Sequence, residues 1–421
     1  MSASVHRNDP ATSASYLSIA EEIETQLRAL IASWFPRCVD TEHGGFHQDF
    51  AADWTRKPGS NRLCIHQARQ TWATARMSLH LPELRRELAT YALHGLAYLS
   101  GPLADDAHGG LFFSVTPDGR AESSWGSEKH ASAIAFAMFA AATTYRATGE
   151  ARALDFAMSL FRWLDDHAYD ARWGGYFDAL APDGTPLLAP GRGGKHDAIG
   201  TPYGYKSTNS LVHVLEALTE LYVIAPEPSI RVRLEETLVL MRERLTLPPG
   251  TLGVFFSPQW HPVLMHGSFG HDVETAYLML EAAGALGSDD GTSAVARAIV
   301  DHTLDWGWDK KHGGVYFAGE ALAPACNRSK WWWVQAEALN AFLHLHERYG
   351  AESDRYWKAF VMQFDFILDH VIDRRYGGWH ACVGEDGEAV TPSDKAMPWK
   401  ATYHDGRALV NASVLLRRMA E

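Results

Sequence analysis

Apolar residues recur at three- and four-residue spacing along most of the chain, in segments rich in Ala, Leu, Glu and Arg. This spacing is typical of amphipathic helices. It predicts twelve helices, over residues 14–33, 62–79, 84–99, 128–148, 150–167, 206–224, 228–245, 268–285, 291–304, 331–349, 353–371 and 403–419. The even-numbered helices are strongly apolar and rich in small residues, as in ASAIAFAMFAAATTY, whereas the odd-numbered helices carry more charge. The even-numbered helices are therefore expected to be the inner, buried set.

Short glycine turns with aromatic residues separate these helices at regular intervals. Five turns contain a Gly-Gly pair, as in HGGF and WGGYF, and the fourth, LGVFF, has a single glycine. Their first glycines are Gly44, Gly109, Gly174, Gly253, Gly313 and Gly377. Each turn follows an odd-numbered helix and precedes an even-numbered one. A period sustained from end to end is a signature of repeat architecture.

The pattern predicts an all-α fold, a closed (α/α)6 barrel of six helical hairpins, in which the two helices flanking a glycine turn form one pair. An open solenoid of the same pairs is the alternative. The small-residue inner helices favour closure, because helices at the centre of a ring must pack closely. The glycine turns are expected to form short β-like excursions at one rim, with glycine supplying positive φ angles. Residues 1–421 are expected to form one domain, with a flexible tail over about residues 1–12.

Composition and charge narrow the range of partners. The chain has 421 residues and a formal net charge of −13, which argues against nucleic acid or an anionic membrane as a partner. It contains no apolar run long enough to span a membrane, and its first residues lack the apolar core of a signal peptide. Four scattered cysteines predict reduced thiols. We expect a soluble cytoplasmic protein, a monomer or homodimer, that needs no cofactor.

Polar and aromatic side chains gather near the starts of the even-numbered helices, where a closed ring would bring them to one central cavity. They are Arg69, His130, Asn209, His213, His271, Glu274, Trp332, Trp333, Glu337, Trp399 and His404. Aromatic faces beside charged and amide groups suit a sugar, because C–H faces stack on rings and hydroxyls form hydrogen bonds. The set therefore predicts a small-molecule carbohydrate as the substrate.

Other functions remain open from the residues alone. A catalytic metal is not predicted, because HExxH is absent and GHDVE lacks a second histidine at helical spacing. A glycoside hydrolase would use paired carboxylates, for which Glu274 and Glu337 are the candidates. A ring that binds carbohydrate without catalysis is a further alternative. Histidines outnumber carboxylates at these positions, which favours proton transfer near neutral pH.

At these motifs the chain resembles the N-acylglucosamine 2-epimerase superfamily, and within it the cellobiose and mannose 2-epimerase branch. The segments SFGHDVETAYLMLEA, WWVQAEALNAFL and WKATYHDGRAL carry the resemblance, and KSTNSLVHVLEAL and the glycine turns support it. The likeness runs over nearly the whole length and implies the (α/α)6 barrel. It also implies an isomerase that acts at C2 of an unphosphorylated aldose without a metal. Epimerisation of the aldose and isomerisation to the ketose are both consistent with it.

The resemblance implies a chemical role for several residues. His271 and His404 match the two acid/base histidines of the family, and His213 matches a third active-site histidine. Arg69 matches a substrate-orienting arginine, and Glu274 a carboxylate beside the catalytic histidine. The implied route removes the C2 proton to give an enediolate and then returns a proton.

Three further positions match residues that hold the sugar. Asn209 matches the asparagine next to the third histidine, and Trp332 or Trp333, together with Trp399, match the stacking tryptophans. At least one tryptophan of the 331–333 triplet is expected to pack between helices instead.

The size of the sugar is not determined by the sequence. Mannose, glucose and a glucose-ended disaccharide such as cellobiose all remain candidates. His130 falls in a K-H-x-Y pattern of the family, but Ser132 stands at the tyrosine position, which puts in doubt a contact made by disaccharide-acting members. The Gly/Pro-rich loop over residues 188–206 is either a lid over the cavity or a surface excursion.

Overall fold

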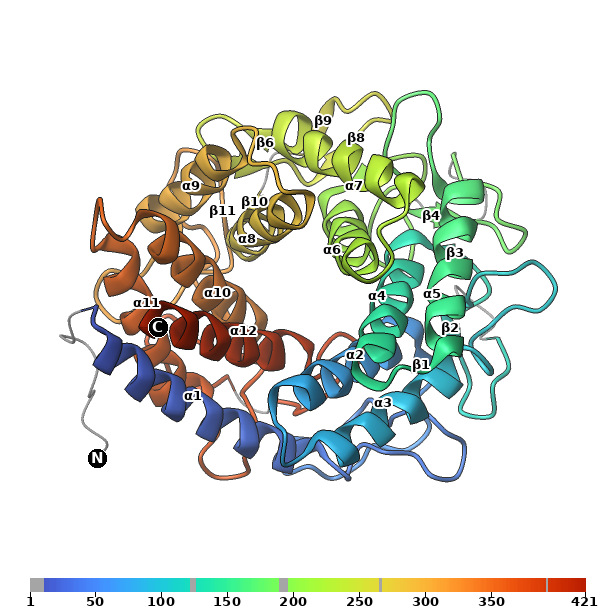
Figure 1. Cartoon of the computed structure of the whole chain (residues 1–421), viewed down its shortest axis with the longest axis horizontal. Helices are drawn as coiled ribbons and strands as arrows, with labels where there is room; N and C mark the ends of the chain where they lie inside the picture. Colours follow the sequence, from blue (N-terminus) through green and yellow to red (C-terminus); the bar gives the residue numbers. More distant parts are fainter. Residues whose placement is uncertain (1–10, 122–125, 189–195, 265–266, 391–392) are drawn as a thin grey trace.

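The computed structural model describes residues 11–121, 126–188, 196–264, 267–390 and 393–421. Within these ranges the chain forms two concentric layers of helices closed into a ring (Figure 1). The inner layer holds α2 (Cys64–His80), α4 (Ala131–Thr148), α6 (Thr208–Ile224), α8 (Phe269–Leu286), α10 (Trp332–Tyr349) and α12 (Tyr403–Ala420). The outer layer holds α1 (Ser13–Trp34), α3 (Arg85–Leu99), α5 (Ala151–Trp163), α7 (Pro228–Leu240), α9 (Thr292–His302) and α11 (Arg355–Phe366). The predicted (α/α)6 barrel is confirmed.

The inner helices close the ring through direct packing. Each packs against the next in chain order, and α12 packs against α2. The first helix, α1, packs on the last, α12, so these two helices lie side by side (Figure 1). Every residue of α4 from Ala131 to Thr144 is buried. The apolar, small-residue helices therefore form the inner layer, as their composition predicts.

Helices that pack closely as pairs are joined at the rim opposite the glycine turns. Short connections link α2 to α3, α4 to α5, α6 to α7, α8 to α9 and α10 to α11, and these pairs make extensive contacts. The sequence pattern had instead suggested pairs on either side of each glycine turn. The glycine turns lie in longer segments, such as residues 35–61, which form the other rim and space their flanking helices apart.

Four outer helices end in a π-helical turn. These turns cover Leu164–Ala168, Met241–Leu245, Thr303–Gly307 and Ile367–Val371, after α5, α7, α9 and α11 respectively. They account for the additional residues that the apolar spacing assigned to these four helices.

Short antiparallel strands connect neighbouring repeats along the glycine-turn rim, confirming the predicted β-like excursions. Each strand that leads into an inner helix pairs with a strand of the following repeat. The pairs are β1 (Arg62–Leu63) with β2 (Ser114–Val115), β3 (Lys129–His130) with β4 (Ala179–Leu180), β5 (Lys206–Ser207) with β8 (Phe255–Phe256), β10 (Gly267–Ser268) with β11 (Ala318–Gly319) and β12 (Lys330–Trp331) with β13 (Cys382–Val383). In the fourth repeat, β6 (Thr246–Leu247) pairs with β7 (Thr251–Leu252), and β9 (Pro262–Leu264) with β8.

The rim is closed by a contact between the first and last repeats. The N–H of Phe50 donates to the carbonyl of Ala396 at 3.2 Å, and the carbonyl of Phe50 accepts from the N–H of Lys395 at 3.0 Å. This bridge takes the place that the short strand pairs occupy between the other repeats.

A buried aspartate anchors each Gly-Gly turn to the segment that leads into the next inner helix. One carboxylate oxygen of the aspartate accepts the backbone N–H groups two and three residues later, and the other oxygen pairs with a buried cation. The ion pairs are Asp40–Arg62, Asp105–Lys129, Asp170–Lys206, Asp309–Lys330 and Asp373–Lys395. All ten glycines of these turns have positive φ. The same pairing of an aspartate with a cation therefore helps to position the starts of α2, α4, α6, α10 and α12.

The predicted N-terminal tail and the predicted lid loop are only partly covered by the described residues. Residues 1–10 of the expected tail lie outside the described residues, whereas Thr12 caps α1 by accepting the N–H of Ser15. The expected lid loop is described at residue 188 and from residue 196 onward.

No helix in the described ranges is long and apolar enough to cross a bilayer. The four cysteines, all within those ranges, are unpaired.

Candidate active site

Three inner helices bring a histidine to the glycine-turn rim. His213 lies in the second turn of α6, and His271 and His404 lie in the first turns of α8 and α12. The ring of Trp333 packs between the last two, with centroid distances of 5.0 Å to His271 and 5.7 Å to His404. The ring of Tyr403 lies 6.4 Å from His213 and 4.7 Å from His404. The structure therefore brings the three predicted catalytic histidines together.

His404 is held by a buried carboxylate. Its Nδ1 lies 2.5 Å from Oε1 of Glu337, and the hydroxyl of Tyr277 donates to Oε2 of Glu337 at 2.6 Å. Burial raises the pKa of Glu337, and the guanidinium of Arg407 offsets that rise only in part. Because an ionised carboxylate only accepts hydrogen bonds, a neutral His404 donates from Nδ1 and presents Nε2 as a base. Burial, followed by the charge of Arg69, lowers the pKa of His404 well below its usual range.

The guanidinium of Arg407 joins three carboxylates at the centre of the barrel. Its Nη2 lies 2.5 Å from Oε1 of Glu274 and 2.7 Å from Oε1 of Glu337, and its Nη1 donates to Glu216. Glu216 is on α6, which faces α12 across the ring (Figure 1). The Arg407 side chain is 2% exposed, and the three glutamates are no more than 4% exposed. Charges buried this deeply are tolerated only when they are paired.

Burial and pairing together set the protonation of the neighbouring groups. Burial raises the pKa of Glu216, but Arg407 and then His213 outweigh it and lower the pKa to about 2. Burial lowers the pKa of His271, and the carboxylate of Glu274 partly opposes this shift. His271 is therefore a neutral imidazole near neutral pH, and part of its surface remains exposed.

Arg69 faces the same centre with unused hydrogen-bond donors. Its Nη1 donates to the carbonyl of Trp399 at 2.8 Å, and its guanidinium lies 4.6 Å from the ring centre of Phe136 and 5.1 Å from that of Tyr403. Within the described part of the chain, its Nε has no partner and no carboxylate comes within ion-pair distance. A buried guanidinium with free donors suits an oxygen that carries negative charge.

The candidate stacking tryptophans differ in how far they are exposed. Trp332 is 3% exposed and lies edge-on to His404 at 6.3 Å, so it packs within the helix layer. Trp333 is partly exposed and contacts two of the three histidines, which makes it the better candidate to face a sugar. Trp399 is 38% exposed in the segment before α12. Asn209 is partly exposed at the second residue of α6, on the same rim.

His130 is placed differently from the other histidines of the predicted site. Its Nε2 lies 2.8 Å from Oδ2 of Asp197, and its Nδ1 lies 3.0 Å from the hydroxyl of Ser132. Burial lowers the pKa of His130, but Asp197 outweighs burial and the net shift is upward. Asp197 belongs to the described part of the 188–206 loop. His130 therefore fastens that loop to the start of α4, and both its ring nitrogens are already bonded.

Two groups of side chains of the metal-ligating kinds occur among the described residues. They are His130–Asp178–Asp197 and Glu274–Glu337–His404. In the second group, Arg407 already supplies the positive charge that the carboxylates require. In the first, Asp178 accepts hydrogen bonds from the hydroxyls of Thr201 and Ser207. In both sets, atoms that could bind a cation already form hydrogen bonds or ion pairs within the protein.

A repeated spacing explains which residues the sequence analysis missed. A histidine is followed three positions later by a charged residue on four inner helices, as HQAR, HVLE, HDVE and HDGR. These motifs are His66–Arg69, His213–Glu216, His271–Glu274 and His404–Arg407. Residues three apart share a helix face, so the two side chains of each motif are neighbours. Glu216 and Arg407 were not singled out, although this spacing would have identified them.

His66 is a further buried histidine that sequence reasoning passed over. Its Nδ1 donates to the carbonyl of Met397 at 3.2 Å, and burial lowers its pKa to about 3. It supports the segment that carries Trp399.

Solved structures with the same architecture cover nearly the whole chain. The cellobiose 2-epimerase from Spirochaeta thermophila DSM 6192 superposes with a TM-score of 0.87 at 29% identity, covering 98% of this chain and 100% of that one. A D-mannose isomerase superposes with a TM-score of 0.82 at 21% identity, covering 98% and 100%. A family 76 glycoside hydrolase, at 13% identity and a TM-score of 0.65, shares the fold alone.

Sequence comparison gives the same relationship. A cellobiose 2-epimerase from Bacteroides fragilis is 28% identical over 397 residues, covering 93% of this chain and 98% of that protein. A D-mannose isomerase from Marinomonas mediterranea is 22% identical over 400 residues, covering 91% and 94%. The model of the N-acylglucosamine 2-epimerase (GlcNAc 2-epimerase) family matches residues 44–408. These matches confirm the resemblance that the motifs indicated, and the chain belongs to the N-acylglucosamine 2-epimerase family.

Proposed function

We propose that the protein is a sugar 2-epimerase that acts on an unphosphorylated aldose, either mannose and glucose or a glucose-ended disaccharide such as cellobiose. Membership of the family makes it an isomerase of the racemase and epimerase class. The observation that carries the proposal is the placement of His271 and His404. Both have a pKa lowered by burial, and both contact the ring of Trp333.

Epimerisation requires a proton to leave one face of C2 and another to arrive on the opposite face. In the proposed reaction, one neutral histidine removes the C2 proton to give an enediolate, and the other protonates the opposite face. His271 and His404 are on α8 and α12, which are separated in the ring by α10. This separation supports a site in which the two bases approach the sugar from different sides. His404 also assists ring opening on the O1/O5 side.

The remaining site residues fit the needs of an enediolate. Among the described residues Arg69 donates to a single carbonyl, so it retains donors for the oxygen that becomes negative. Trp333 and Trp399 offer exposed ring surface for the C–H face of a sugar. His213 and Asn209 lie at the start of α6 and contact the hydroxyls of the substrate in this proposal.

An aldose–ketose isomerase is the second candidate, favoured by the D-mannose isomerases among the similar proteins. Such an enzyme would use the same histidines but return the proton to C1. A glycoside hydrolase is disfavoured by the state of its two candidate acids. Glu274 and Glu337 are 1% and 0% exposed and bind the same guanidinium nitrogen, so neither is free to protonate a leaving group.

Incubation with mannose, glucose, cellobiose, lactose and N-acetylglucosamine, with every product resolved, tests the proposal. The C2 epimer of at least one sugar is expected as the main product. Formation of the ketose alone would identify an isomerase, and release of new reducing ends from a glycoside would identify a hydrolase. Binding of a sugar without any product would contradict an enzymatic role.

A further inference from the structure

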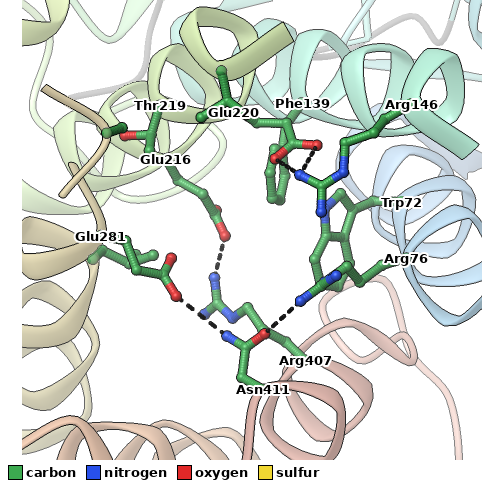
Figure 2. Close-up of a pocket in the computed structure, with 13 residues that line it drawn as sticks. Trp72, Arg76, Phe139, Arg146, Glu216, Thr219, Glu220, Glu281, Arg407 and Asn411 are labelled. Atoms are coloured by element: carbon green, nitrogen blue, oxygen red, sulfur yellow. Dashed lines mark hydrogen bonds and ion pairs between the residues drawn. The ribbon is translucent and has the colours of Figure 1, made fainter. Parts of the chain in front are cut away.

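Figure 2 shows a polar cavity of about 300 Å³, whose lining residues place it in the half of the barrel away from the glycine turns. Side chains from five inner helices line it, namely α2, α4, α6, α8 and α12, and most come from the middle or C-terminal parts of these helices. Arg407 and Glu216 form its inner end, where it meets the central carboxylates from the side opposite the histidines. Arg146 is exposed at its outer end. The volume matches the lower limit for small-molecule sites.

The polar groups of the cavity leave hydrogen-bonding capacity for a ligand. Asn411 links two helices, accepting from Nη2 of Arg76 at 3.3 Å and donating to Oε1 of Glu281 at 3.4 Å (Figure 2). Both distances exceed the usual 2.9–3.0 Å, so these three side chains are only weakly bonded to one another. A ligand hydroxyl between them would make shorter contacts with a donor and an acceptor at once.

The charges of the cavity select against an ionic ligand. Arg146 is paired with Glu220 at 3.0 Å, whereas among the described residues Arg76 bonds only to the amide of Asn411. An anion near Arg76 would be repelled by Glu220 and Glu281, and a cation would be repelled by Arg76 and Arg146. A neutral molecule that both donates and accepts hydrogen bonds meets neither penalty.

The cavity also has aromatic side chains in its lining. The rings of Trp72 and Phe139 are stacked 5.1 Å apart along one side of the cavity (Figure 2). Aromatic surface beside alternating donors and acceptors is suited to a polyhydroxylated molecule, whose C–H groups pack on rings. We propose that this cavity is a second binding site, for a neutral polyol or sugar of monosaccharide size, distinct from the histidine site. The proposal does not depend on the reaction proposed above.

Counting bound D-glucitol per chain tests this site directly. D-glucitol has no carbonyl group, so the C2 proton transfer proposed above cannot consume it. Equilibrium dialysis of the full chain should give two bound molecules, one in each site, and Asn411→Leu should give one while retaining sugar turnover. If the histidine site does not bind this polyol, the intact chain should bind one molecule and Asn411→Leu none. The same number of molecules bound by both proteins would overturn the proposal.

A second pair of variants, with smaller changes, tests the site even if Asn411→Leu does not fold. The hydroxyl of Thr219, which lines the cavity, donates to the carbonyl four residues earlier at 2.7 Å, and Thr90 on α3 does the same at 2.9 Å. Thr219→Val should weaken D-glucitol binding at the second site about 3- to 10-fold by removing one hydrogen bond. Thr90→Val should leave binding unchanged. Equal affinities in the two variants would contradict the assignment.

Discussion

The guanidinium of Arg407 reaches across the barrel axis to the carboxylate of Glu216. The same guanidinium bonds to Glu274 and Glu337, and Glu337 in turn bonds to His404. One buried cation therefore sets the positions of three carboxylates and, through them, of a candidate base. It also separates the histidine site from the polar cavity behind it.

Replacing Arg407 with methionine should strongly destabilise the fold. The variant leaves three buried carboxylates without their cation, and breaking a buried ion pair costs about 3–5 kcal/mol. Arg418→Met is the matched control on the same helix, because Arg418 is 58% exposed in its pair with Glu347. It should change the free energy of unfolding by less than about 1 kcal/mol. Urea unfolding monitored by circular dichroism measures both, and equal stabilities would refute the role of Arg407.

Replacing Glu337 with glutamine should slow turnover about 100-fold or more. The loss is expected because the carboxylate that holds Nδ1 of His404 also fixes Nε2 as the base, and a positioned base contributes about 10²–10⁴-fold. The control is Glu347→Gln, near the C-terminal end of the same helix, α10, and it should retain activity. Initial rates of epimer formation measure the effect, and a loss smaller than about threefold in Glu337→Gln would count against this arrangement.

The pH dependence of catalysis should reflect the low pKa of His271. A base acts when unprotonated, and burial lowers the pKa of His271 below its ordinary value of 6.5. The acid limb of kcat/KM is therefore expected below pH 6.5. Glu274 raises this pKa, so Glu274→Gln should move the limb to still lower pH. Rates from pH 4.5 to 8 on protein shown to be folded test the sign, and a limb above pH 6.5 would contradict it.

The buried Asp–Lys pairs of the rim should contribute measurably to stability. Burial opposes ionisation of Asp309, but Lys330 and backbone N–H groups outweigh it and lower the pKa from 3.8 to about 2. Lys330→Met should cost about 3–5 kcal/mol at neutral pH, because it leaves a buried carboxylate unpaired. Lys57→Met, which breaks an exposed pair with Asp394, should cost less than about 1 kcal/mol.

The pH dependence of this effect has a definite sign. A carboxylate with a lowered pKa stabilises the fold above its unfolded value and loses that contribution as the pH falls through its folded value. The stability difference between the intact chain and Lys330→Met should therefore shrink between about pH 4 and pH 2. A difference that stays constant over this range would exclude Asp309 as its origin.

The helices and the rim turns could be predicted because their signals are local. The apolar runs of α4 and α10 identify inner helices without knowledge of the partners, and each Gly-Gly pair marks a turn by its positive φ. The candidate catalytic histidines could be singled out because each stands near the start of such a helix. Trp332 and Trp333 could not be told apart, because their different exposures depend on how α10 is rotated in the ring.

The contacts that cross the barrel could not be predicted from these local signals. The bond from Arg407 to Glu216 joins residues 191 positions apart and depends on which helices face each other. The pairing of His130 with Asp197 depends on the return path of a loop that the sequence marks only as rich in Gly and Pro. Closure of the ring by Phe50 and Ala396 joins the first and last repeats, and no pattern within one repeat specifies it.

Deuterium exchange at C2 of the substrate in D₂O tests the two-base reaction most directly. The intact protein is expected to give an epimer that carries one solvent deuterium at C2, and His271→Ala and His404→Ala are each expected to abolish that exchange while remaining folded. Exchange at nearly the rate of the intact protein in either variant, or epimerisation without deuterium at C2, would contradict the account.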